Sequence, residues 1–292
     1  MGIALQLLFN SLVTGLVLAV MAVGFHLAFR TAKVFHLAHG AVFVAGAYLY
    51  LLVRGDTSGM GVPALLTVLA GGALLAWLMQ VLVYRPLERR KAGQEISLIA
   101  SMGLYLLVVE GLALAFGNQA RMAFFGDALP FSLGALVVAP AQTTQLVAAV
   151  LALLLVVRLL HGERGLPFRA VMSQPTVATV LGVDAARVRA RAMALSGMLA
   201  ALAGALVVID TGIHPHAGLG ITLSAAVAVI LGGARSLPGT IAAAIALAFV
   251  QTGTEWFLGA PWKEGITFLI LILVLLWKTE GIVAFDLRPE ER

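Results

Sequence analysis

The stretch RLLHGERGLPFRAVMSQPTVATVLGVDAARVRAR, which runs from Arg158 to Arg191, is the longest polar interval in an otherwise apolar chain. Pro175 suits the first turn of a helix, where its missing N–H costs nothing. Gly182 can adopt the left-handed conformation that ends a helix, and Asp184 can cap the next one. The pattern predicts a short helix with sharp ends between two apolar segments.

The predicted short helix has an apolar stripe. Val177, Val180 and Leu181 are spaced i, i+3, i+4, so they share one helical face. A short helix with one apolar edge on a basic surface is suited to docking against another protein. The alternative is an interfacial segment that lies on lipid headgroups. The sequence pattern alone leaves both interpretations open.

Composition restricts the class of protein. The chain has 292 residues, of which 61% are hydrophobic and 11% charged, with a mean hydropathy of +1.02. Soluble domains are roughly 25% charged, so repeated apolar runs of this kind indicate a bilayer protein. There are no cysteines, which excludes disulfides and thiolate metal sites.

The apolar runs predict an all-α polytopic membrane protein, one bundle of about nine helices, with eight or ten as alternatives. The seventh run is short for a crossing, so a broken or re-entrant helix is expected there. The nine predicted spans are Ala4–Phe29, Val34–Val53, Val62–Tyr84, Ile96–Phe116, Pro140–Leu160, Ala190–Ile209, Leu219–Leu231, Pro238–Leu258 and Gly265–Ile282.

The distribution of basic residues predicts the orientation. With the N-terminus outside and the C-terminus in the cytoplasm, sixteen Lys and Arg residues fall in inner segments and three in outer ones. This bias fits the positive-inside rule. The three outer residues are Arg54, Arg121 and Lys263. The polar segment 161–191 is then cytoplasmic, and the loop 117–139 faces outward as a docking or lid element.

The sequence contains no energy-coupling chemistry of its own. It has neither the phosphate-binding loop motif nor a dinucleotide fingerprint. Glu110 lies alone inside an apolar run, without the paired carboxylates of a proton-driven pump. His26, His36 and His39 lie near a span junction, where packing or hydrogen bonding is favoured over metal binding. These absences favour a transport subunit driven by a separate ATPase.

Four motifs occur in a fixed order along the chain. The first two are His36-Leu37-Ala38-His39-Gly40 with Gly46-Ala47-Tyr48, and Arg85-Pro86-Leu87. The third is Arg169-Ala170, Pro175, Ala178, Gly182-Val183, and the fourth is Gly232-Gly233-Ala234-Arg235-Ser236-Leu237-Pro238-Gly239.

On these motifs the sequence resembles the permease subunits of ATP-driven (ABC) importers for branched-chain amino acids, a group that includes urea and short-amide permeases. The resemblance covers nearly the whole chain and implies one permease domain, residues 1–292, in the bacterial inner membrane. It implies cytoplasmic ATPase subunits, a second permease (a paralogue or itself) and an external solute-binding protein as partners, in contact with lipid. No enzyme activity, cofactor, metal or nucleic acid is expected.

The apolar stripe, the position of Glu110 inside an apolar run and the resemblance together give the candidate residues. Those expected to couple to the ATPase are Arg169, Ala170, Pro175, Val177, Ala178, Val180, Leu181 and Gly182. Those expected along the substrate pathway are His36, His39, Gly40, Gly46 and Glu110. The glycine signature comprises Gly232, Gly233, Ser236 and Gly239.

Three departures from the family pattern concern the solute. His36 replaces the usual Asn, Arg235 replaces the third glycine of the late signature, and Thr176 stands where the coupling motif is usually acidic. A branched-chain or other hydrophobic amino acid is the expected solute, with urea or short amides as the alternative. An autonomous channel or ion-coupled carrier, and an intramembrane histidine enzyme, are the remaining alternatives.

Overall fold

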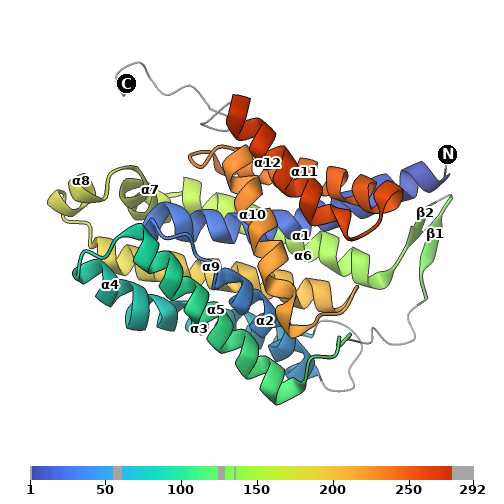
Figure 1. Cartoon of the computed structure of the whole chain (residues 1–292), viewed down its shortest axis with the longest axis horizontal. Helices are drawn as coiled ribbons and strands as arrows, with labels where there is room; N and C mark the ends of the chain where they lie inside the picture. Colours follow the sequence, from blue (N-terminus) through green and yellow to red (C-terminus); the bar gives the residue numbers. More distant parts are fainter. Residues whose placement is uncertain (1, 55–60, 124–128, 135, 278–292) are drawn as a thin grey trace.

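The computed structural model describes residues 2–54, 61–123, 129–134 and 136–277. Over these residues the chain is almost entirely helical (Figure 1). The helices are α1 (Gly2–Ala32), α2 (His39–Arg54), α3 (Val62–Met79), α4 (Arg85–Arg89), α5 (Gln94–Phe116), α6 (Pro140–His161), α7 (Leu166–Ser173), α8 (Pro175–Val180), α9 (Ala185–Val208), α10 (Gly218–Leu231), α11 (Leu237–Leu258) and α12 (Trp262–Trp277).

Three short turns and one hairpin complete the elements. A π-helical turn, Gln80–Tyr84, joins α3 to α4, and 3₁₀ turns at Glu163–Gly165 and Pro215–Ala217 precede α7 and α10. Strands β1 (Phe131–Leu133) and β2 (Leu136–Val138) form an antiparallel pair in which Phe131 faces Val138. The all-α prediction is confirmed, and the hairpin lies within the loop 117–139.

Most predicted spans correspond to single helices. In the part of the chain that the structure describes, six helical segments are long and apolar enough to cross a membrane, and α2 and α10 are shorter apolar helices. The predicted short seventh span is confirmed, because α10 has only 14 residues and ends at Leu231, just before Gly232. The ninth prediction, Gly265–Ile282, runs past Trp277 and so partly lies outside the described residues.

Two ends of the bundle can be distinguished (Figure 1). One carries α4, α7 and α8, and we call it the basic end. The other carries the N-terminus of α1 and the β1–β2 hairpin, and we call it the hairpin end. At the hairpin end, Arg121 and Ile213 exchange backbone hydrogen bonds, and the Gln6 side chain pairs with the backbone of Val137.

The core is built around α1 and α9. Helix α1 packs against α6, α9, α10 and α11, while α9 also packs against α2 and α3. The small residues at four-residue intervals in α9, such as Gly197, Ala201 and Ala205, are buried. Close approach of this kind replaces the hydrophobic driving force that helices lack inside lipid.

Candidate functional site

Helix α8 presents the predicted apolar stripe to the outside. Val177, Val180 and Leu181 are 48%, 81% and 76% exposed. The helix begins at Pro175, as predicted. Gly182 has a φ of +86°, the left-handed conformation expected of a helix stop, and the Asp184 side chain accepts from the Arg187 N–H to cap α9.

The opposite side of α8 is buried. Ala178 is 2% exposed and packs with Val171 of α7 and Val188 of α9. Ala178 was predicted to couple to the ATPase, but its buried side chain instead anchors α8 to α7 and α9. The exposed stripe is accessible to a partner. Ala170, partly buried, packs against the same cluster.

Arg169 also has an internal role. Its guanidinium donates to the backbone carbonyls of Leu160 and Gly162, at the end of α6. These bonds fix the turn between α6 and α7. Arg169 thus supports the position of the α7–α8 segment, and its guanidinium does not belong to the exposed stripe.

Charged contacts tie this segment to the rest of the basic end. Arg30, in the last turn of α1, donates to the Met172 carbonyl of α7 at 3.1 Å. Arg189 of α9 donates to the Thr31 carbonyl at 3.2 Å and forms an ion pair with Glu88 of α4. The ends of α1, α4, α7 and α9 therefore form one connected unit beneath α8.

The glycine signature forms the tight turn between α10 and α11. Gly232 and Gly239 pack backbone to backbone, leaving no room for a Cβ on either. Gly233 has a φ of +80°, and the Ser236 hydroxyl accepts from the Gly239 N–H at 3.0 Å to cap α11. The signature thus builds the turn.

Arg235, which replaces the third glycine of that signature, is exposed and adds positive charge to the basic end. Burial, together with neighbouring Arg30 and Arg235, lowers the pKa of Lys33. The departure from the family pattern therefore changes the charge of this surface.

The histidines near the start of α2 are buried and hydrogen-bonded. His36 Nδ1 lies 2.8 Å from the Tyr84 hydroxyl, and His26 Nδ1 lies 3.0 Å from Thr240 Oγ1. His39 lies between the Met21 carbonyl, at 3.2 Å, and the Ser196 hydroxyl, at 3.3 Å. Within the described residues, no group of three His, Cys, Asp or Glu side chains could hold a metal.

The other predicted pathway residues lie at helix contacts or at the surface. Gly40 packs directly against Gly218 and Thr222 of α10, and Gly46 packs against Ala201 of α9. Glu110 is exposed on α5. The structure therefore places His36, His39, Gly40 and Gly46 at helix contacts, while Glu110 points away from the bundle core.

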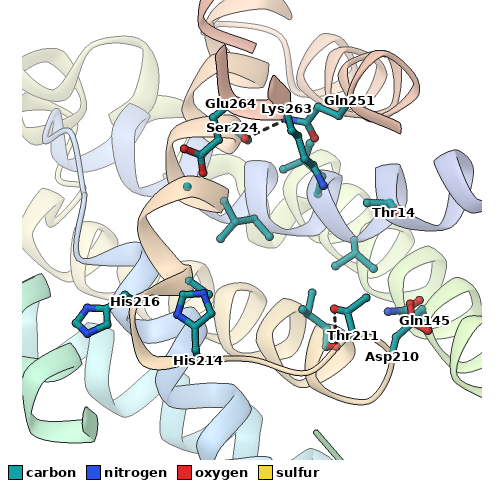
Figure 2. Close-up of a pocket in the computed structure, with 16 residues that line it drawn as sticks. Thr14, Gln145, Asp210, Thr211, His214, His216, Ser224, Gln251, Lys263 and Glu264 are labelled. Carbon is teal, nitrogen blue, oxygen red and sulfur yellow. Dashed lines mark hydrogen bonds between the residues drawn. The ribbon is translucent and has the colours of Figure 1, made fainter. Parts of the chain in front are cut away.

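A cavity of about 380 Å³ lies at the hairpin end (Figure 2). Ligand pockets are typically about 300–1,000 Å³, so a small solute fits. The lining residues are Thr14, Val17, Leu18, Gln145, Val207, Asp210, Thr211, His214, His216, Ala217, Gly220, Ile221, Ser224, Gln251, Lys263 and Glu264.

Two glutamines of this cavity were not among the residues predicted from the sequence. Gln145 of α6 and Gln251 of α11 are each 4% exposed. Gln251 donates to the Ser224 and Thr267 hydroxyls at 3.1 and 2.9 Å. In the sequence, each glutamine is an amide inside an apolar run. Such an amide indicates a functional site less strongly than a charged residue inside the membrane does.

Asp210, just beyond the end of α9, is the half-buried acid of the cavity. Burial raises the pKa of its carboxyl, and a hydrogen bond from Gln145 partly opposes that rise. A carboxylate that has lost water in this way gains from the approach of a cation.

These features define a class of protein: a multi-pass membrane transport subunit with an exposed apolar stripe on α8 and a cavity at the opposite end. The chain belongs to the family described as the branched-chain amino acid transport system permease component, which it matches over residues 7–275.

Curated relatives extend over nearly the whole chain. The LivH high-affinity branched-chain amino acid permease of Escherichia coli K12 is 28% identical, over 98% of this chain and 96% of its own. The probable LivH permease of Methanocaldococcus jannaschii is 28% identical, over 94% and 91%. The BraD permease of Pseudomonas aeruginosa is 25% identical, over 98% and 96%. No solved structure matches the chain.

Proposed function

We propose that this chain is the permease subunit of an ATP-driven importer that carries branched-chain or other hydrophobic amino acids across the bacterial inner membrane. The observation that carries the proposal is the exposed apolar stripe of α8, whose buried face is fixed to α7 and α9. The relatives named for branched-chain amino acids support the solute class. No cavity feature favours urea or short amides instead.

The proposal includes the threading predicted from charge. Residues 1–292 form one permease domain that crosses the membrane nine times, with the N-terminus outside and the C-terminus in the cytoplasm. The basic end is then cytoplasmic, which agrees with the positive-inside rule. The hairpin end, with its cavity, faces the compartment from which solute arrives.

The coupling segment 161–191 would transmit motion from the ATPase. Cytoplasmic ATPase subunits bind the stripe of Val177, Val180 and Leu181, and nucleotide-driven closure displaces α8. Because α7 is bonded to α1 through Arg30 and α9 is bonded to α4 through Arg189, that displacement reaches the membrane helices. Rigid-body movements of this kind alternate access in transporters.

The assembly requires further partners. A second permease, either a paralogue or another copy of this chain, would complete the membrane pathway, and an external solute-binding protein would deliver the amino acid. ATP hydrolysis would be supplied by the ATPase subunits. The exposed apolar faces of α3, α5 and α6 suit contact with lipid or with that second permease.

The α8 stripe is tested with Val180→Asp in the complete importer. An unpaired charge at the centre of the contact costs more than about 1.4 kcal/mol, so leucine uptake should fall at least about tenfold. Since Val180 is 81% exposed in this chain, its level in the membrane should stay normal.

Thr179→Asp is the matched control. It adds the same charge to an exposed residue of α8. Thr179 lies off the stripe, because residues one or two apart in a helix do not share a face. Uptake by this variant should stay close to that of the wild type. Normal uptake by Val180→Asp would contradict the docking role of α8.

A further inference from the structure

We propose that the cavity at the hairpin end is a binding site for a free α-amino acid with an aliphatic side chain, on the route into the membrane pathway. This inference rests on the proposed function, and it locates a solute site within this single chain. The coupling helix lies at the other end of the bundle, so the cavity has no part in docking the ATPase (Figure 1).

The cavity carries charge of both signs. Lys263 and Glu264, in the first turn of α12, line it together with Asp210. In Figure 2, Lys263 enters the hollow from one wall and Asp210 lies on the opposite wall. A free amino acid carries one ammonium and one carboxylate, so it can meet a partner of opposite charge at each wall.

Lys263 is available for this role. Its ammonium lies 3.5 Å from a carboxylate oxygen of Glu255, a residue that does not line the cavity. Their side chains are 37% and 50% exposed. An exposed pair at that distance is weak, so a solute carboxylate can compete for the lysine.

The wall opposite Lys263 also holds a buried acceptor without a donor. The Gln145 amide donates to the Leu206 carbonyl at 2.8 Å, but its Oε1 is buried and makes no hydrogen bond within the described residues. Buried polar atoms almost always have a partner. Gln145 lies beside Asp210 on the same wall (Figure 2), so an ammonium bound there would satisfy both groups.

Aliphatic side chains form part of the remaining lining, beside hydroxyl, imidazole and amide groups. Val17 and Leu18 of α1, Val207 of α9 and Ile221 of α10 contribute apolar surface between the charged walls. An aliphatic side chain gains by leaving water for such a surface. A cationic wall, an anionic wall and aliphatic surface between them together favour an aliphatic amino acid. An amine, a carboxylic acid or an uncharged amide can use only some of these features.

The absence of cysteine from the chain allows a direct test. Ile221→Cys places one thiol in the cavity wall, and Asn118→Cys places a control thiol at an exposed position just after α5. The complete importer, in vesicles with its solute-binding side outward, is treated with a membrane-impermeant maleimide. The labelling rate of this subunit is measured by mass spectrometry.

Leucine should slow labelling of Ile221→Cys about twofold at the concentration that half-fills the site, and should leave Asn118→Cys unchanged. Isoamylamine, which lacks the carboxylate, and isocaproate, which lacks the ammonium, should protect much less. Val207→Cys on another wall should behave like Ile221→Cys. Equal protection by all three compounds, or none by leucine at either cavity thiol, would overturn the proposal.

Charge variants in the Ile221→Cys background identify the carboxylate partner. Lys263→Gln should lose protection by leucine, and Lys263→Arg should keep it. Glu255→Gln is the matched control: it removes the salt-bridge partner but keeps the lysine, so protection should persist. Full protection in Lys263→Gln would overturn this assignment.

Uptake and protection distinguish failure of the proposed function from failure of the cavity assignment. An importer that takes up no branched-chain amino acid contradicts the proposed function. An importer that takes up leucine without protecting either cavity thiol contradicts only the cavity assignment.

Discussion

Gly46 lies where α2 meets α9, and a Cβ at this position would overlap Ala201. By contrast, Gly103 of α5 has open space around the same position. The two residues are both helical glycines in apolar runs, so only the fold separates them. Gly46 was expected along the substrate pathway, yet its missing side chain lets two backbones approach.

This difference predicts opposite effects of adding one methyl group. Gly46→Ala should destabilise the purified chain, because overpacking typically costs about 1–3 kcal/mol. Gly103→Ala adds a better helix former at an open position and should cause no loss. Thermal unfolding in detergent measures both, and a Gly46→Ala variant as stable as Gly103→Ala would contradict the packing role.

At the scale of a single element, the proposed coupling role of α8 depends on a well-defined C-terminal end. Gly182 has a φ of +86°, and a Cβ added there would meet nothing within 4 Å, so a substitution acts through the backbone alone. Gly182→Val should cost about 1–3 kcal/mol because a β-branched residue is strained in this conformation. An Asn residue tolerates this left-handed conformation better than Val does.

We therefore expect leucine uptake to decrease in the order wild type, Gly182→Asn, Gly182→Val, with all three chains inserted in the membrane. The order follows from the need for α8 to move as a unit with α7 and α9. If Gly182→Val transported as fast as the wild type, a defined end to α8 would not be required for coupling.

The same element shows what a sequence can predict. Pro175, Gly182 and Asp184 obey local rules of helix ends, so both limits of α8 were predictable. The buried side was not, because Ala178 is covered by Val171 and Val188 from two other helices. Hydropathy likewise predicted most spans, but not the β1–β2 hairpin within a loop of mixed character.

The cavity was the least predictable feature. Its lining comes from α1, α6, α9, α10, α11, α12 and the loops between them, so no spacing along the chain marks it. Gln145, Gln251 and Ser224 are uncharged, and a search for buried charge passes over them. His36 and His39 were predicted along the pathway because they are polar and lie near a span. In the structure Met21 and Ser196 bond both ring nitrogens of His39, while Tyr84 bonds only Nδ1 of His36.

At the scale of the whole molecule, the two proposed functions lie at opposite ends of the bundle. The basic end carries the proposed docking helix and the ion pair between Arg189 and Glu88. The hairpin end carries the proposed solute cavity. Helices α1 and α9 connect the two ends through a close-packed core, which is how movement at one end can change the other.

The most direct measurement of this separation uses Val180→Cys in the assembled importer. The free thiol should react with an impermeant reagent only from the cytoplasmic side. In a second sample, in which that thiol carries a benzophenone maleimide, irradiation should cross-link this chain to the ATPase subunit. Asn118→Cys should react only from the outside and yield no such product. Reaction of Val180→Cys from the outside, or a cross-link to lipid alone, would contradict the assignment of α8 as the cytoplasmic docking helix.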